Sequence, residues 1–212
     1  MNVSVYRMQT CIKMCVLIAG LAFIGVNTLH AADQPDVTIH AVVTGDSVES
    51  LSHKGAMTET IYMSQGRTRV DFDAGPELRG RILRDAQHVW LLRANQVVAI
   101  PDNHIAVGKV AQLDPQQPCW DLGFACQQVE NRVIAGHETT GWRYSHAGQA
   151  GPDGTDSGVL WIDAEQGIVL GFDARDLGEH DHRMQAVDVS YDKLDEDTFA
   201  LPKATQIMLQ KP

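Results

Sequence analysis

The sequence predicts a single, mainly β domain of about ten short strands, and three observations carry this prediction. From Val37 onward, apolar residues recur with period two or in short runs, which is the pattern of strands rather than of amphipathic helices. Gly, Pro, Asn and Asp bound these runs, as they bound strands at turns. No composition break, fixed-period repeat or low-complexity tract divides the rest of the 212-residue chain, and this length suits one domain or at most two.

Residues 1–31 are predicted to be a secretory signal peptide, which leaves 32–212 as the β domain. Arg7 and Lys13 precede the uncharged apolar run 14–26, and small residues follow it. The 13 residues of this run are fewer than the roughly 20 that a membrane-spanning helix needs. An uncleaved N-terminal anchor is the alternative. We therefore expect a periplasmic or secreted protein that is not an integral membrane protein after cleavage.

The charge balance excludes several classes of partner. The chain has 17 Lys+Arg and 27 Asp+Glu, a net charge of −10. Cleavage after Ala31 or Ala32 removes two cationic side chains and no carboxylate, so 15 Lys+Arg and 27 Asp+Glu remain, a net of −12. Binding to nucleic acid is excluded because phosphate contacts need clustered Lys and Arg. Anionic headgroups should repel such a chain, so a bound lipid would have to enter through an apolar opening.

The cysteines predict one disulfide bond. Cys11 and Cys15 belong to the signal peptide, and neither ends the apolar run as a lipid-modified cysteine would. Cys119 and Cys126 remain in a compartment where disulfides persist. Closing their eight-residue ring is worth on the order of 2.5 kcal/mol by loop entropy. A redox pair or a metal pair is the alternative, although six intervening residues differ from a Cys-x-x-Cys motif.

The first half of the domain is predicted to form an antiparallel meander, because its turns are short. One example is the hairpin around Gly66, a turn residue that suits a tight connection. Alternation along its second strand places polar and charged side chains on the face opposite Val70 and Phe72. The expected strands cover 37–43, 57–63, 67–72, 78–83, 88–92 and 97–100.

A short helix and a loop are expected over 102–118, where the alternation stops. Strands resume afterwards, and a Gly- and Asp-rich segment over 147–156 predicts a flexible hairpin loop between two of them. The expected strands cover 127–134, 139–146, 158–163, 168–173 and 183–192.

Several of these segments, in this order, resemble bacterial envelope proteins of the LolA/LolB-like (outer-membrane lipoprotein-sorting) superfamily. Within that superfamily the sequence looks closest to a periplasmic group of undefined function. The similarity covers most of 37–205. It rests on the Gly-turn hairpin 62–72, the Trp-bearing hairpin 82–92, the strand pairs 134–143 and 161–170, and the exit Phe199-Ala200-Leu201-Pro202.

The resemblance implies an open, incompletely closed antiparallel β-barrel of about 10–11 strands, with one or two short helices over 46–52 and 103–113. In this superfamily the concave apolar face is covered by helices and admits acyl chains. The implied function is a non-enzymatic carrier or binding module for a lipid, a lipoprotein or another apolar ligand of the cell envelope. Sensor domains of the same superfamily regulate envelope-stress signalling, so a protein–protein regulatory module is the alternative.

Four aromatic residues are the candidates for contact with an apolar ligand. Phe72, Trp90, Trp142 and Trp161 fall on strands that would line the barrel. Aromatic side chains in such positions either fill the core or form the floor of a cavity. Both interpretations remain open from the sequence.

No motif of enzymatic chemistry occurs in the chain. It lacks a Gly-x-Ser-x-Gly elbow, a phosphate loop and a His-Glu-x-x-His helix. His180 and His182 could bind Zn²⁺ or Cu²⁺ if a third ligand came from elsewhere, but a solvated hairpin tip is the preferred interpretation, since every side chain from Glu179 to His182 is polar. His137 and His40 lie in or beside strands, where single histidines are usually hydrogen-bonded surface residues. We predict no catalytic residue, no metal and no cofactor.

Carboxylates form two groups that a hydrolase could use. Asp71 and Asp73 share a strand face, and four more crowd near the C-terminus. Catalysis would need a dry cleft and matched pKa values, whereas charge runs are usually solvated. A hydrolytic or metal-binding protein is therefore the third interpretation. The C-terminal group is Asp192, Asp195, Glu196 and Asp197.

Overall fold

The computed structural model describes residues 35–52, 55–76, 78–93, 96–100, 112–119 and 125–202. All of them belong to the second of two units into which the chain divides, 33–212. The predicted signal peptide lies outside the described residues, as does nearly all of the helix expected over 103–113. Among the described residues, no helix is long and apolar enough to cross a membrane.

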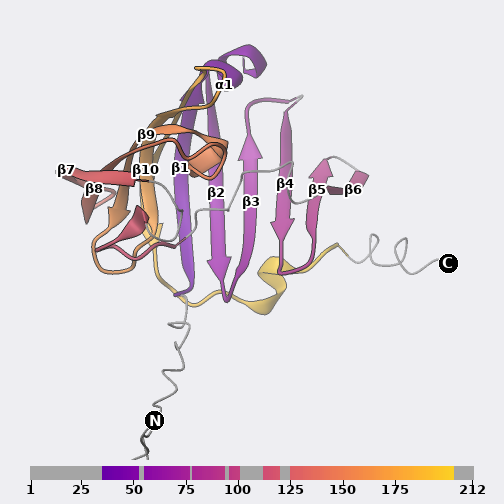
Figure 1. Ribbon diagram of the computed structural model, residues 1–212. Helices are drawn as coiled ribbons and strands as arrows, with labels where there is room; N and C mark the ends of the chain where they lie inside the picture. Colours follow the sequence, from indigo (N-terminus) through magenta and orange to yellow (C-terminus); the bar gives the residue numbers. More distant parts are fainter. Residues whose placement is uncertain are drawn as a thin grey trace, which may run out of the picture. The chain divides into compact units, whose positions relative to one another are not determined.

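Eleven strands form one antiparallel sheet, which confirms the mainly β prediction (Figure 1). Each expected strand is present, with ends that move by at most two residues. The strands are β1 (Val37–Gly45), β2 (Ala56–Ser64), β3 (Arg67–Asp73), β4 (Arg79–Arg84), β5 (Val89–Arg93), β6 (Gln96–Ile100), β7 (Ala125–Ile134), β8 (His137–Ser145), β9 (Ser157–Asp163), β10 (Val169–Arg175) and β11 (Asp181–Ser190).

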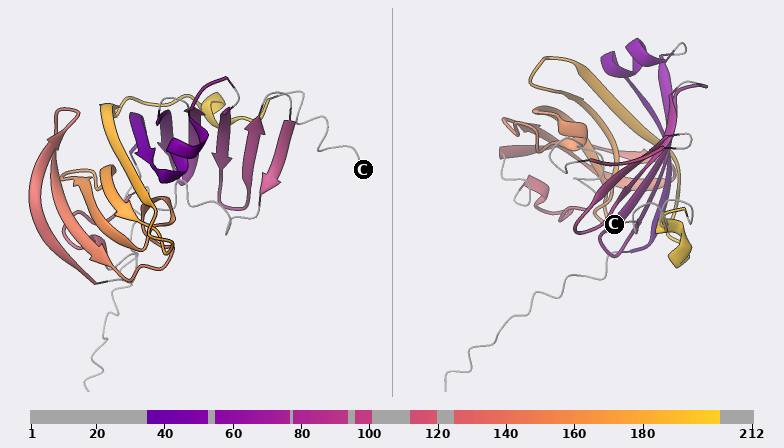
Figure 2. Two further views of the ribbon diagram at one scale, coloured as in Figure 1. Left: turned by 90° about the horizontal axis from the view of Figure 1, so that it is seen from above. Right: turned by 90° about the vertical axis from the view of Figure 1, so that its right-hand side faces the viewer.

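The sheet consists of two meanders joined by their first and last strands. Its order is β6-β5-β4-β3-β2-β1-β11-β10-β9-β8-β7. β1 pairs with β11 in antiparallel register, with a bulge after His40. β6 and β7 are thereby the two edges, and the curved sheet remains open between them (Figure 2). This is the open, incompletely closed arrangement that the resemblance implies.

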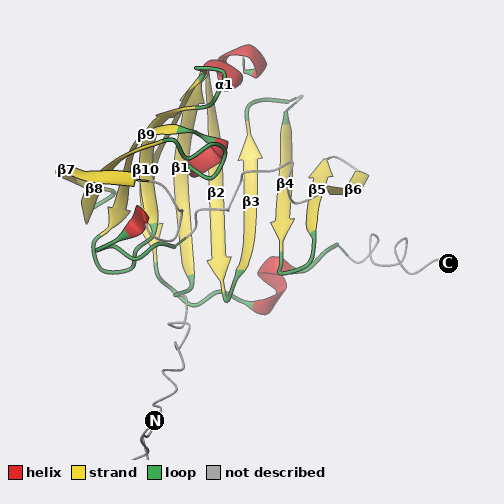
Figure 3. Cartoon of the chain, in the orientation of Figure 1, coloured by secondary structure: helices red, strands yellow, loops and turns green. Residues whose placement is uncertain are grey.

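Helical structure in the described residues is confined to short segments (Figure 3). The segment expected over 46–52 forms α1 (Asp46–Leu51), and two 3-10 turns, η2 (Pro152–Gly154) and η3 (Glu196–Phe199), lie later in the chain. Gly45 makes the sharp exit from β1 possible, since its φ is +130° and a Cβ there would lie 2.1 Å from the carbonyl oxygen of Asp181. Val48 then reaches the core from α1.

The segment over 147–156 does join two strands, but it is held in place rather than flexible. The amide of Ala147 donates to the carbonyl of Asp156 at 3.0 Å, and that of Gly151 donates to the carbonyl of Thr155 at 3.0 Å. The buried Tyr144 hydroxyl is hydrogen-bonded to the Thr155 side chain. Because these bonds anchor both arms of the loop, η2 at its tip has a defined position.

The core lies on one side of β1 and extends over β8 to β11. β1 buries every second residue, as a strand with one covered face should. β9 and β10 are buried on both faces, because the end of β7 folds over the second face after a bulge between Val129 and Arg132. The Trp161 indole donates to the Glu130 carbonyl at 3.3 Å beneath this cover. Continuous apolar runs in β9 and β10 follow from this double burial.

Candidate functional site

One face of the sheet is mainly apolar. Directly opposed residues in antiparallel strands share a face, so the register extends the buried side of β1 to its neighbours. We call this surface the apolar face. Its members from β1 to β5 are Val37, Ile39, Ala41, Val43, Met57, Ile61, Met63, Val70, Phe72, Ile82, Val89 and Leu91. Its members on β8 to β11 are Trp142, Tyr144, Leu160, Ile162, Phe172, Ala174, Met184 and Ala186.

The two halves of the apolar face differ in how well they are covered. On β1 and β9 to β11, the side chains belong to the hydrophobic core and are almost completely buried. On β2 to β5, several remain only half-buried, and these are Met57, Ile61, Phe72, Ile82 and Leu91. Large apolar side chains that keep contact with solvent offer a surface on which another apolar group gains free energy by packing.

Glu59 interrupts this half of the apolar face. It lies on β2 directly opposite Ala41 on one side and Phe72 on the other. No hydrogen bond or ion pair joins its carboxylate to any residue that the structure describes. Burial, with the negative charge of Asp153 as a smaller second cause, raises the pKa of Glu59 from 4.5 to about 7. A carboxyl group therefore stands among apolar neighbours without a compensating cation.

Asp153 is itself paired, unlike Glu59. His182 Nδ1 lies 2.9 Å from Asp153 Oδ2, and Nε2 lies 3.4 Å from Asp176 Oδ2. Asp153, which has the larger effect, and Asp176 raise the pKa of His182. Backbone amides of His180 and Gly178 also donate to Asp176, and together with the histidines they lower its pKa to about 2. Both carboxylates of this cluster therefore have polar partners, whereas Glu59 has none among the described residues.

Sequence reasoning missed Glu59 although the signal was present. The strand alternates Met57, Glu59, Ile61 and Met63, so period two places the carboxylate among three apolar side chains. The sequence does not reveal that no cation lies opposite, because that depends on pairing with β1 and β3.

The four predicted aromatic residues divide between two faces. Phe72 and Trp142 lie on the apolar face, on strands that are far apart in the sheet. Trp90 lies on the opposite face, with its ring stacked on that of His88 at a centroid distance of 5.4 Å. Trp161 also lies on that face, beneath the end of β7. Contact of any of them with a ligand stays a prediction.

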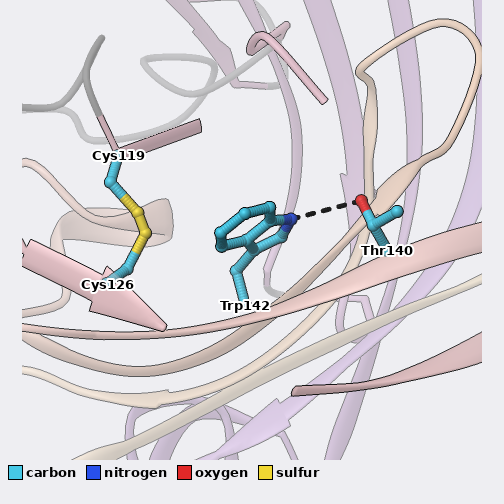
Figure 4. The surroundings of a disulfide bond; sticks show 4 residues. All are labelled: Cys119, Cys126, Thr140 and Trp142. Atoms are coloured by element: carbon cyan, nitrogen blue, oxygen red, sulfur yellow. Dashed lines mark hydrogen bonds between the residues drawn. A yellow bond between two sulfur atoms is a disulfide. The ribbon is translucent and has the colours of Figure 1, made fainter. Parts of the chain in front are cut away.

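The predicted disulfide bond is present between Cys119 and Cys126. Their Cα atoms are 5.8 Å apart, within the usual range for a disulfide. Cys126 lies opposite Tyr144 at the start of β7, and the indole of Trp142 lies nearby, donating to Thr140 Oγ1 at 3.2 Å (Figure 4). The bond thus ties the segment 112–119 to the edge of the sheet beside the apolar face.

The histidines singled out in the sequence have carboxylate or hydroxyl partners. His180 and His182 both contact Asp176, from the hairpin tip that joins β10 to β11. His137 lies 3.2 Å from the buried Asp163, and His40 lies 3.1 Å from Thr60 Oγ1 on the exposed face. Within the described ranges, no group of three or more His, Cys, Asp or Glu side chains is placed to hold a metal ion.

Three of the carboxylates singled out in the sequence, Asp71, Asp73 and Glu196, are bound by arginines. Asp71 accepts hydrogen bonds from Arg69 and, at 2.7 Å, from Arg81 Nε. Asp73 pairs with Arg79 at 2.9 Å on the same face. Of the C-terminal group, Glu196 pairs with Arg67 at 3.1 Å and brings η3 against β3. These contacts organise the polar face of β3 and β4.

Comparison with known proteins identifies the fold. No protein-family model matches the chain, and no curated protein matches it either. Among solved structures, MucB matches with a TM-score of 0.51 at 14% identity over 81% of this chain. The chain spans 58% of the length of that structure. An uncharacterized conserved protein from Thermus thermophilus matches with a TM-score of 0.51 at 15% identity, covering 80% of this chain and 87% of its own.

A LolA superfamily protein from Nitrosomonas europaea is also matched, with a TM-score of 0.39 at 8% identity over 79% of this chain and 91% of its own. The matches to MucB and to the Thermus protein show that the chain has the fold of these structures, and LolA-like folds are among the solved structures that it matches. Identities this low show the fold alone.

Proposed function

We propose that the protein is a non-enzymatic binding module of the cell envelope, and that its apolar face receives the apolar chain of a lipid or a lipoprotein. The observation that carries this proposal is the half-buried set of apolar side chains on β2 to β5, which continues the core on a sheet that is not closed. Each methylene of an apolar chain that packs on these side chains is stabilised by about 0.8 kcal/mol of transfer free energy.

An extracytoplasmic location supports the same proposal. The basic, apolar and small-residue order of 1–31 is that of a secretory signal. A Cys119–Cys126 disulfide persists in an oxidising compartment. An acidic protein, with a net charge of −12 after removal of 1–31, would bind lipids and lipoproteins there through apolar contacts rather than through anionic headgroups.

Dye displacement tests this function. An uncharged lipophilic dye should bind the purified protein saturably, and a twelve-carbon alcohol should displace it. Phe72→Ala removes a ring from the apolar face and should weaken dye binding severalfold. Trp90→Ala is the matched control, since it removes a larger ring from the opposite face of the same sheet region. Absence of saturable binding, or equal loss in both variants, contradicts the proposal.

A protein-binding regulator is the second candidate, and the sheet edges favour it. Val98 on the edge strand β6 is 51% exposed, and Val133 on the other edge strand, β7, is 70% exposed. Free strand edges can pair with a strand of another chain. MucB has been solved in complex with MucA from Pseudomonas aeruginosa. A partner of this kind would protect edge-strand amides from hydrogen exchange and leave dye binding unchanged.

A further inference from the structure

We propose that the ligand of the apolar face carries a cationic amine group, and that the carboxylate of Glu59 binds it. This inference rests on the proposed function and adds the chemical class of the ligand. Glu59 lies opposite Ala41 and Phe72, in the half of the apolar face whose side chains are not fully covered.

The charges around Glu59 decide which polar group fits. An anionic group, such as a carboxylate or a phosphate, would meet Glu59 itself and the field of Asp153, which is of the same sign. An uncharged polar group of the ligand would shield Glu59 from water without supplying an opposite charge. Burying an ionised, unpaired carboxylate in this way costs free energy. An ammonium group supplies both the opposite charge and hydrogen-bond donors.

No cation of the described chain fills this role. His182 is held between Asp153 and Asp176, with its ring nitrogens 2.9 and 3.4 Å from their carboxylates. Arg84 lies on the apolar face opposite Thr68 and makes contacts of its own. Thr68 and Phe72 are four residues apart on β3, which is about 13 Å along a strand. Arg84 therefore sits near one end of the face and Glu59 near the other.

The placement also suits an amphipathic ligand. Met57 and Ile61 flank Glu59 on β2, and Phe72 lies beside it, so an apolar body attached to the amine would pack on these side chains. We accordingly expect ligands with a single aliphatic body and a primary amine, rather than anionic lipids or polyamines without an apolar part.

Three probes with the same twelve-carbon chain test the inference: dodecylamine, dodecanol and dodecanoate, each below its micelle concentration. Displacement of the uncharged dye is measured at about pH 8, where Glu59 is largely ionised. We expect the amine to bind about tenfold more tightly than the alcohol, the scale of one charge-assisted hydrogen bond. The carboxylate should bind more weakly than the alcohol.

Variants assign the preference to Glu59. Glu59→Gln keeps the shape of the side chain and removes its charge, so the variant protein should bind dodecylamine and dodecanol equally. The matched control, Glu165→Gln, removes the same charge from an exposed turn between β9 and β10 and should keep the tenfold preference. If the wild-type protein binds all three probes equally, or Glu59→Gln keeps the preference, this inference is wrong while the proposed function stands. If no probe binds, both fail.

Discussion

At the scale of single residues, the feature that most distinguishes this chain is an acid on an apolar surface. The polar face shows the ordinary arrangement, in which Asp71 is bound by Arg69 and Arg81. Glu59 has no such partner among the described residues and lies on the opposite face of the sheet, on the neighbouring strand β2. Because an unpaired carboxylate among apolar side chains opposes folding, the position of Glu59 is explained more naturally by binding than by stability.

Since an ionised Glu59 opposes folding, we expect Glu59→Gln to raise the free energy of unfolding by an amount that depends on pH. The folded protein holds the Glu59 proton more tightly than the unfolded chain does, since the pKa rises from 4.5 to about 7. Wild-type stability attributable to this group therefore falls as the pH rises through that window and stays low above it. The variant escapes this loss, and its advantage in free energy of unfolding should grow from near zero at about pH 4 to at most roughly 3 kcal/mol at about pH 8.

Urea denaturation at the two pH values measures this difference. Glu165→Gln, in the exposed turn between β9 and β10, is the charge-matched control. An advantage of Glu59→Gln that is independent of pH, or that the control shares, would mean that Glu59 is adequately paired in the folded protein.

At the scale of elements, the end of β7 is the unusual part of the sheet. After its bulge, β7 crosses above Trp161, and Arg132 lies over the indole with its guanidinium carbon 3.9 Å from the ring centroid. Gly141 on β8 makes this possible, because a Cβ there would lie 2.4 Å from the Glu130 carbonyl oxygen and 3.0 Å from Trp161 Nε1. The second buried layer over β9 and β10 therefore depends on a glycine.

Gly141→Ala should consequently destabilise the protein by on the order of 1–3 kcal/mol, the usual cost of overpacking. Chemical denaturation with tryptophan fluorescence as the probe measures the change. Gly136→Asn is the control, because this turn residue has φ +84° and nothing within 4 Å of a built Cβ, and Asn tolerates that conformation. Equal stabilities of the two variants would show that the end of β7 moves aside at little cost.

The strands could be predicted from the sequence because alternation and turn residues are local signals. Pairing between β1 and β11 could not, since no local pattern indicates which distant strand completes a sheet. The segment 147–156 was expected to be flexible from its Gly and Asp content. Its order comes from the contact of Tyr144 with Thr155, which composition does not reveal.

The candidate site was predictable only in part. Phe72 and Trp142 lie on the apolar face, as expected of residues that line a barrel. Trp90 and Trp161 lie on the other face, and the alternation around Trp90 already separates it from Val89 and Leu91. Trp161 is harder to place, because its strand is buried on both faces and the alternation there is hidden.

Across the whole sheet, one half of the apolar face is covered by the core, and the other half keeps contact with solvent. Side chains on β1 and β9 to β11 form the core, and the disulfide and α1 lie against that half. β2 to β5 extend the same face with half-buried apolar side chains that lead to β6, the last strand on this side of the described sheet. A stable core beside an incompletely covered apolar surface is the arrangement expected of a binding module.

The most direct test of this account is photo-crosslinking with a twelve-carbon amine that carries a diazirine in its chain, followed by peptide mapping. We expect labels on β2 and β3, at Met57, Ile61 or Phe72, that excess dodecylamine suppresses and that Glu59→Gln reduces. Labels confined to the polar face or to the edge strands β6 and β7, or labelling that dodecylamine does not suppress, would contradict it.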